Sequence, residues 1–168
     1  MEKVQSNKFI YRLLAIGLIV ITLICFVLVK MEMRVKTISV DGIPVVSEAT
    51  GAKVTIESIG RGKDTYVGKT VIQIGGFAYL EGKETSSVSM HVLLLDETEG
   101  KVYELPTAMK QLPSVTELAG DGVNYDNCGF SVGFYTRNKT LSTGYFRVMI
   151  LYTLNGEDYL IATDTYLE

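Results

Sequence analysis

The chain has 168 residues, enough for one ordinary domain and an appendage. Hydrophobic residues make up 47% and charged residues 21%, which excludes a disordered or low-complexity chain. The formal net charge of -3 lacks the basic excess of a nucleic-acid-binding protein, and two cysteines are too few for a disulfide framework. We therefore expect no nucleic-acid partner.

An uncharged apolar segment near the N-terminus predicts a membrane-spanning helix. Residues 13–29 are 17 residues without a charge, and at about 1.5 Å per residue they form a helix of about 26 Å. That length approaches the roughly 30 Å of a bilayer core, and Arg12 and Lys30 can extend their charges to its two surfaces. The prediction is a cytoplasmic tail at 1–8, a transmembrane signal-anchor helix at 9–30 and a linker at 31–35.

The apolar segment does not resemble a cleaved signal. It is longer than the usual signal-peptide core, and no small-residue cleavage site follows it. Ile24 stands before Cys25, where a lipoprotein signal would need a small residue. The lysines and arginines on the two flanks are equal in number, but a short tail before a first span usually stays inside. We expect a single-pass protein that contacts the bilayer through residues 9–30, with an extracytoplasmic C-terminal domain.

The remaining residues, 36–168, predict an all-β domain. Runs with alternating apolar and polar residues recur between turn signals, which is typical of half-buried strands. Asn155-Gly156 predicts a tight hairpin, and Ser114–Leu118 one helical turn. The expected architecture is a single antiparallel β-sandwich of about eight strands, immunoglobulin-like or jelly-roll-like. The predicted strands are Lys36–Asp41, Ala52–Ile59, Lys69–Glu81, Ser87–Asp96, Lys101–Leu105, Cys128–Thr136, Gly144–Leu154 and Asp158–Tyr166.

One alternative is a divergent sortase-like cysteine transpeptidase. His91, Cys128 and Arg137 occur in the chain order that such enzymes use, with imidazole activating the thiolate and arginine holding the oxyanion. The surrounding sequence, however, lacks the sortase Thr-Leu-x-Thr-Cys strand. Strand alternation places Cys128 with Phe130 on the core face and Arg137 opposite, which favours a structural cysteine and a surface histidine. We therefore assign no catalytic residue.

Two regions of the chain are candidate contact surfaces. A glycine-rich loop carries oxygen-bearing side chains that suit calcium, but their spacing fits no defined calcium motif, so we expect an ordinary turn without metal or cofactor. Tyrosines recur along the predicted strands, and exposed aromatic rings can stack on sugars or anchor a protein. The predicted ligand or partner surface is Asp121, Asn124, Tyr125, Asp126, Tyr135 and Arg137.

The stretch Gly76–Leu154 resembles a known module. It contains Gly76-Phe77-Ala78-Tyr79, then a strand–hairpin–strand, then Asn124-Tyr125-Asp126-Asn127-Cys128-Gly129-Phe130 and Gly144-Tyr145-Phe146-Arg147-Val148. This pattern is similar to a β-sandwich module associated with bacterial cell-surface polysaccharide glycosyltransferases and related envelope membrane proteins. The chain departs from it at Phe77, where an aromatic residue such as tryptophan is expected, near Leu112, where arginine is expected, and at Cys128, where serine is expected.

The resemblance implies a non-catalytic role in the bacterial envelope. In that family the module is not the catalytic part, so the chain would act as an accessory or binding module in cell-envelope polysaccharide assembly. Its partner would be a polytopic membrane glycosyltransferase or transporter, or an envelope glycan. A further alternative is a small structural subunit of a larger membrane complex.

Overall fold

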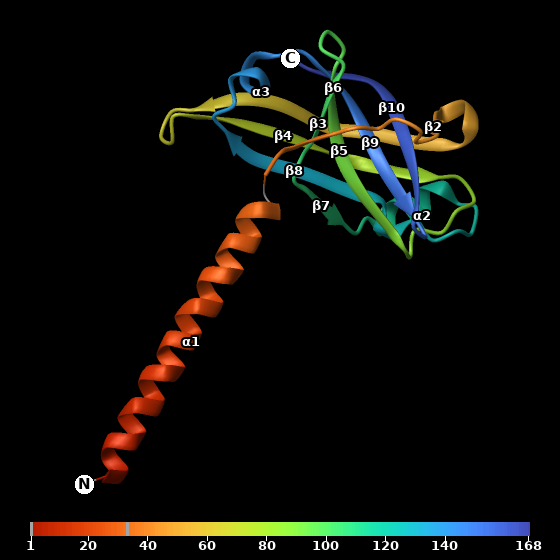
Figure 1. Cartoon of the computed structure of the whole chain (residues 1–168). Helices are drawn as coiled ribbons and strands as arrows, with labels where there is room; N and C mark the ends of the chain where they lie inside the picture. Colours follow the sequence, from red (N-terminus) through yellow and green to blue (C-terminus); the bar gives the residue numbers. More distant parts are fainter. Residues whose placement is uncertain (1, 33) are drawn as a thin grey trace. The chain divides into compact units, whose positions relative to one another are not determined.

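The computed structural model describes residues 2–32 and 34–168, and the chain divides after Arg34 into two compact units. The first contains α1 (Glu2–Glu32), which includes the predicted segment 9–30 and continues beyond it at both ends (Figure 1). Within α1, Ile10–Val29 is long and apolar enough to cross a membrane, by length and composition. Met1 of the predicted tail and Met33 of the predicted linker lie outside the described residues.

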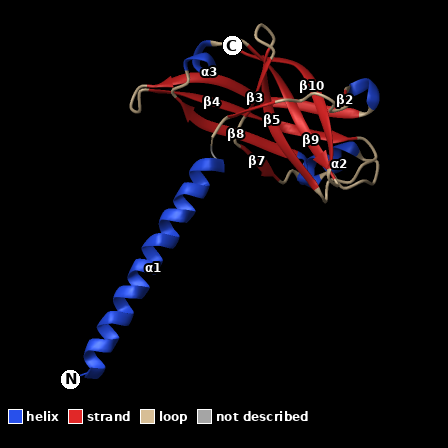
Figure 2. Ribbon diagram, viewed as in Figure 1, coloured by secondary structure: helices blue, strands red, loops and turns tan. Residues whose placement is uncertain are grey.

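The second unit is built mostly from β-strands (Figure 2). Over residues 35–168 the structure has ten strands in two sheets, one in the order β1-β6-β5-β9-β10-β2 and the other β3-β4-β8-β7. The strands are β1 (Lys36–Ile38), β2 (Val45–Val46), β3 (Ala52–Asp64), β4 (Lys69–Leu80), β5 (Val88–Asp96), β6 (Lys101–Glu104), β7 (Thr107–Lys110), β8 (Gly129–Thr136), β9 (Phe146–Leu154) and β10 (Glu157–Leu167). Short helices are η1 (Glu48–Thr50), α2 (Pro113–Ala119), η2 (Asp126–Cys128) and α3 (Lys139–Thr143).

The expectation of about eight strands, all antiparallel, is wrong in two places. β2 is a strand of two residues that pairs parallel to β10, which makes the six-stranded sheet mixed. β7 follows Pro106 in the stretch where no strand was predicted, and it pairs antiparallel to β8. Both strands are too short to show an alternating pattern, so their pairing comes from the tertiary structure and not from local sequence.

A shared apolar core holds the two sheets face to face. Strands β4 and β8 of the four-stranded sheet and β5 and β9 of the six-stranded sheet all contribute to it. Fully burying one side chain of this size contributes about 1.5–3 kcal/mol, so this core is the main stabilising feature of the domain. Its central residues are Ile72, Ile74, Val92, Leu94, Phe130, Val132, Val148 and Ile150, each at most 4% exposed.

The outer face of the six-stranded sheet is also covered. Leu93, Met149 and Leu160 form a second buried cluster, against which Ile38 and Ile43 pack. The chain from β1 to β2 therefore lies over this sheet. As a consequence β5 is apolar on both faces, which explains the uninterrupted run of leucines at its end.

A bulge in β3 accounts for one essential glycine. The pairing of β3 with β4 shifts register between Ile56 and Ser58, opposite Gly75 and Gly76. A Cβ atom on Gly76 would collide with the carbonyl oxygen of Thr55. Only glycine therefore allows the two strands to approach this closely at the bulge.

Candidate functional site

The predicted contact loop is held together by Tyr125. Its ring is fully buried, and ring centroids of Tyr125 and Tyr79 lie 4.2 Å apart. Its hydroxyl donates to Asp121 Oδ2 at 2.6 Å and accepts the N–H of Gly82 at 2.8 Å. Burial, and secondly the bond to Asp121, raise the pKa of Tyr125. Tyr125 thus lies beneath the surface and ties the loop to the turn after β4.

The other polar side chains of the loop bind neighbouring parts of the protein. Asp121 Oδ1 accepts the N–H of Val123 at 3.0 Å, and Asp126 Oδ1 accepts the hydroxyl of Thr116 at 2.6 Å. Asn124 Oδ1 accepts the N–H of Asp126 at 2.8 Å. The bonds from Tyr125 and then Val123 lower the pKa of Asp121. These oxygens shape the loop, as Asp and Asn commonly do in turns.

Both carboxylates of this loop, Asp121 and Asp126, accept hydrogen bonds from the protein. In the part of the chain that the structure describes, there is no group of three or more His, Cys, Asp or Glu side chains that could hold a metal ion. The loop instead packs with α2 over one end of the four-stranded sheet. The cluster of Val115, Tyr125 and Cys128 lies there against Phe77 and Tyr79.

Cys128 is a buried member of this cluster. Cys128 is the last residue of η2 and directly precedes β8, so the alternation of side chains along the strand does not apply to it. Contrary to the prediction, it therefore does not lie with Phe130 in the core between the sheets. Burial raises the pKa of its thiol to about 11. A thiol with this pKa is protonated near neutral pH and is a poor nucleophile.

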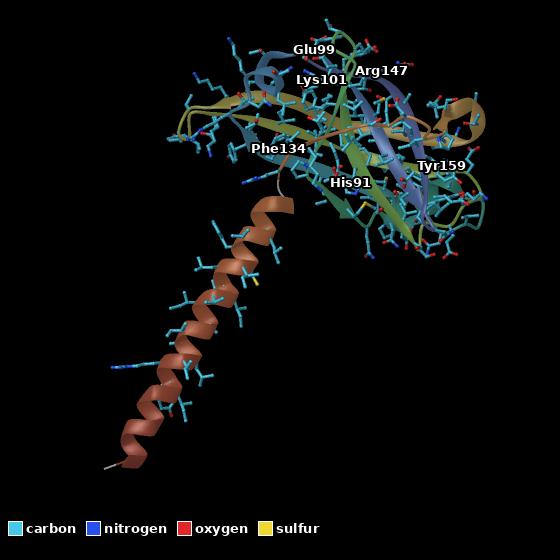
Figure 3. All side chains as sticks on the ribbon, viewed as in Figure 1. His91, Glu99, Lys101, Phe134, Arg147 and Tyr159 are labelled. Carbon is cyan, nitrogen blue, oxygen red and sulfur yellow. The ribbon has the colours of Figure 1, made fainter. Side chains whose placement is uncertain are left out.

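The residues of the transpeptidase alternative are widely separated. His91 lies on β5 in the other sheet (Figure 3), with its side chain 41% exposed and Nδ1 3.3 Å from Glu104 Oε1. Arg137 follows β8 directly, whereas Cys128 directly precedes it. At about 3.3 Å per residue the length of β8 keeps these two residues roughly 30 Å apart. The fold therefore does not bring the three side chains together.

The outer face of the four-stranded sheet is open beyond the part that α2 covers. Tyr135 projects from it, 52% exposed, and its hydroxyl donates to Asp64 Oδ2 at 3.1 Å. Next along the sheet, Gly60, Gln73 and Gly133 stand side by side on β3, β4 and β8, all exposed. We call this area the open face and define it by its residues Gly60, Gln73, Ser131, Gly133 and Tyr135.

The small residues make the open face flat. A second row lies beside the first, in the order Ser58, Gly75, Ser131 and Ala108 across β3, β4, β8 and β7. Gly75 of this second row is buried, whereas Gly60 and Gly133 of the first row are exposed and leave the backbone accessible to a ligand that lies across the strands. Tyr135 is among the surface residues predicted from the sequence, whereas Gln73 and Ser131 are not. The available signal was the recurrence of glycine and serine at the outward positions of β8.

At the edge of the same sheet, Arg61 joins three segments of the fold. Its guanidinium donates to the carbonyl oxygens of Leu141 at 2.9 Å, of Gly144 at 2.6 Å and of Glu168 at 3.1 Å. Burial lowers the pKa of Arg61. An open cavity of about 550 Å³ lies beside it, lined also by Lys63. Because the guanidinium already binds backbone oxygens, it fastens α3 and the end of β10 to β3.

No protein-family model, curated protein or solved structure matches this chain.

Proposed function

We propose that the chain is a membrane-anchored, non-catalytic binding module whose open face holds a ligand or partner. Its β domain would be a sandwich of the immunoglobulin-like or jelly-roll-like kind, and α1 the transmembrane signal anchor. The setting that the resemblance suggests is the bacterial cytoplasmic membrane, with the domain extracytoplasmic. The ligand would be an envelope polysaccharide, or the partner a polytopic glycosyltransferase or transporter that handles one.

The observation that carries the proposal is the composition of the open face. Tyr135 offers an exposed ring for stacking, while Gln73, diagonally across the strand pair, and Ser131, four residues away along β8, offer hydrogen-bonding groups on the same face. Sugars present apolar ring faces and hydroxyl groups together, and this combination matches both. The glycines between these side chains let a chain-like ligand lie close to the sheet.

The dispersal of His91, Cys128 and Arg137 further favours binding over catalysis. Nucleophilic catalysis needs its groups within hydrogen-bond reach of one another, and the length of β8 alone separates two of them. The polar side chains of the loop Asp121–Asp126 stabilise the fold, so this loop is a weaker candidate for ligand binding than the open face. The open face is therefore the place where a binding function is best tested.

The test compares two exposed tyrosines in different parts of the domain. Tyr135→Ala removes the aromatic ring of the open face, while Tyr145→Ala removes a similarly exposed ring just before β9. The probe is polysaccharide extracted from the cell envelope of the source organism, and binding to the full-length protein in nanodiscs is measured. We expect Tyr135→Ala to weaken binding about tenfold, the loss of one aromatic anchor, and Tyr145→Ala to leave it unchanged.

A second arm tests the protein-partner form of the proposal. Mild crosslinking in native membranes, followed by affinity purification and mass spectrometry, should recover a polytopic glycosyltransferase or transporter with the wild type and much less of it with Tyr135→Ala. The assignment of the open face would be refuted if Tyr135→Ala recovered as much of the partner, and bound as much polysaccharide, as the wild type.

A further inference from the structure

The tip of the β3–β4 hairpin exposes apolar side chains in a fixed turn. Tyr66 is 100% exposed and Val67 is 48% exposed. The turn is held by Asp64, whose Oδ1 accepts the N–H of Tyr66 at 2.8 Å and that of Val67 at 3.0 Å. Gly68 closes it with a φ of 63°. The fold therefore presents these two side chains outward at a defined position, with Tyr66 free of packing contacts and Val67 half covered.

Basic residues surround this tip. Lys63 and Lys69 flank it in the sequence, Arg137 lies beside Lys69 because Thr136 pairs with Thr70, and Lys139 follows two residues later at the start of α3. Among the described residues none of these four cations has an ion-pair partner. Asp64 is the acidic residue within the turn, and its oxygens bind the turn and Tyr135, while Glu168 lines the same cavity as Lys63. This group of residues 63–69, 137 and 139 is called the basic tip below.

The rest of the domain carries the opposite charge. Residues 35–168 contain 17 acidic and 11 basic residues, of which one acidic and four basic residues belong to the basic tip. The acidic β5–β6 hairpin projects in a different direction from the basic tip (Figure 1). Other exposed apolar side chains lack the same setting: Leu118 adjoins Glu117, and Tyr145 stacks on Tyr166 at 4.8 Å. The basic tip is therefore a local exception on an acidic domain.

The anchor keeps this domain beside a bilayer. α1 ends at Glu32 and β1 begins at Lys36, and four residue steps span at most about 14 Å. If α1 crosses the membrane, as proposed above, the domain always has one side near the lipid headgroups. An anionic surface repels acidic faces and attracts basic ones, and tyrosine and lysine are favoured at the membrane interface.

We infer that the basic tip is a second membrane contact, in which Tyr66 and Val67 enter the headgroup region and the surrounding cations bind anionic lipids. This inference rests on the proposed anchoring by α1. The contact would fix the orientation of the domain on the membrane. The open face, which adjoins the basic tip through Tyr135 and Asp64, would then lie close to the bilayer surface.

The test uses the absence of tryptophan from the sequence. Tyr66→Trp places one tryptophan at the basic tip, and Leu118→Trp places one at the exposed surface of α2 as the matched control. Both full-length variants are reconstituted into vesicles of phosphatidylcholine alone or mixed with phosphatidylglycerol, each with brominated acyl chains. Quenching of the tryptophan emission by bromine, and a blue shift, report contact with lipid.

The inference predicts quenching and a blue shift for Tyr66→Trp in anionic vesicles and much less in neutral ones. Adding Lys63→Glu and Lys69→Glu, or 1 M salt, at which the screening length falls to about 3 Å, should abolish most of the difference. Leu118→Trp should keep the emission of a solvated residue throughout. Equal emission of Tyr66→Trp in both vesicle types, or equal quenching of the control, would overturn the inference.

Flotation of the same vesicles separates this inference from the proposal on which it rests. Protein that floats with both vesicle types while Tyr66→Trp remains unquenched is anchored by α1, so that only the lipid contact of the basic tip is refuted. Protein that fails to float refutes the anchor and the inference together.

Discussion

Replacing Tyr125 with phenylalanine removes one oxygen atom from the loop Asp121–Asp126 and leaves the buried ring in place. The lost hydroxyl donates to Asp121 at 2.6 Å and accepts from Gly82 at 2.8 Å. A hydrogen bond to a charged group contributes about 1.5–3 kcal/mol and a neutral one about 1 kcal/mol. Asp121 and Gly82 lie at the surface and can bind water instead, so we expect a net loss of about 2 kcal/mol in the free energy of unfolding.

Thermal unfolding of the full-length protein, followed by circular dichroism, measures this loss. For a domain of this size about 2 kcal/mol lowers the melting temperature by roughly 6–8 °C. Tyr135→Phe is the matched control, because its hydroxyl also donates to an aspartate but at an exposed position. It should leave the melting temperature unchanged. Equal melting temperatures for both variants would refute the structural role of the loop and return Asp121 and Asn124 to the candidate ligand surface.

Three further predictions concern other parts of the domain. In a Cys25→Ser background, Cys128 should resist iodoacetamide near neutral pH and react only in denaturant, since burial raises its pKa to about 11; rapid labelling of the folded protein would contradict this. Gly76→Ala should prevent folding because its Cβ meets the β3 backbone, whereas Gly133→Ala, with open space around it, should melt like the wild type; a folded Gly76→Ala protein would disprove the close approach. Arg61→Met should cost about 2–4 kcal/mol and speed hydrogen exchange in α3 and at the end of β10, and unchanged exchange there would count against its fastening role.

The sequence predicted those elements whose own residues carry the signal. Asn155 and Gly156 form the expected hairpin, with φ values of 53° and 86° between β9 and β10. The helical turn expected at Ser114–Leu118 is found as α2, although it begins after Leu112 with Pro113 in its first turn and not at a Ser114 cap. Pro113 fits the first turn because proline lacks the N–H that would remain unpaired there.

The elements that the sequence did not predict depend on distant partners. β2 exists because β10 offers it a free edge, and the cover over Leu93 and Met149 comes from the chain between β1 and β2. β3 extends to Asp64, five residues beyond its predicted end, because pairing with β4 compensates for the glycines in that half. Neither the edge nor the partner strand is visible in a local pattern of alternation.

The candidate site shows the same division between local and distant causes. Aspartate and asparagine in a glycine-rich loop suit a calcium ligand set and an ordinary turn equally well, because both use the same oxygen atoms. What separates the two roles is which donor occupies each oxygen, and here the donors are Thr116, Tyr125 and backbone N–H groups. The open face differs from the loop because its outward residues are not constrained by packing. The alternating pattern of each strand shows only that these residues point away from the core. A binding surface of that kind becomes recognisable once strand pairing places Gln73, Ser131 and Tyr135 on one side of the sheet.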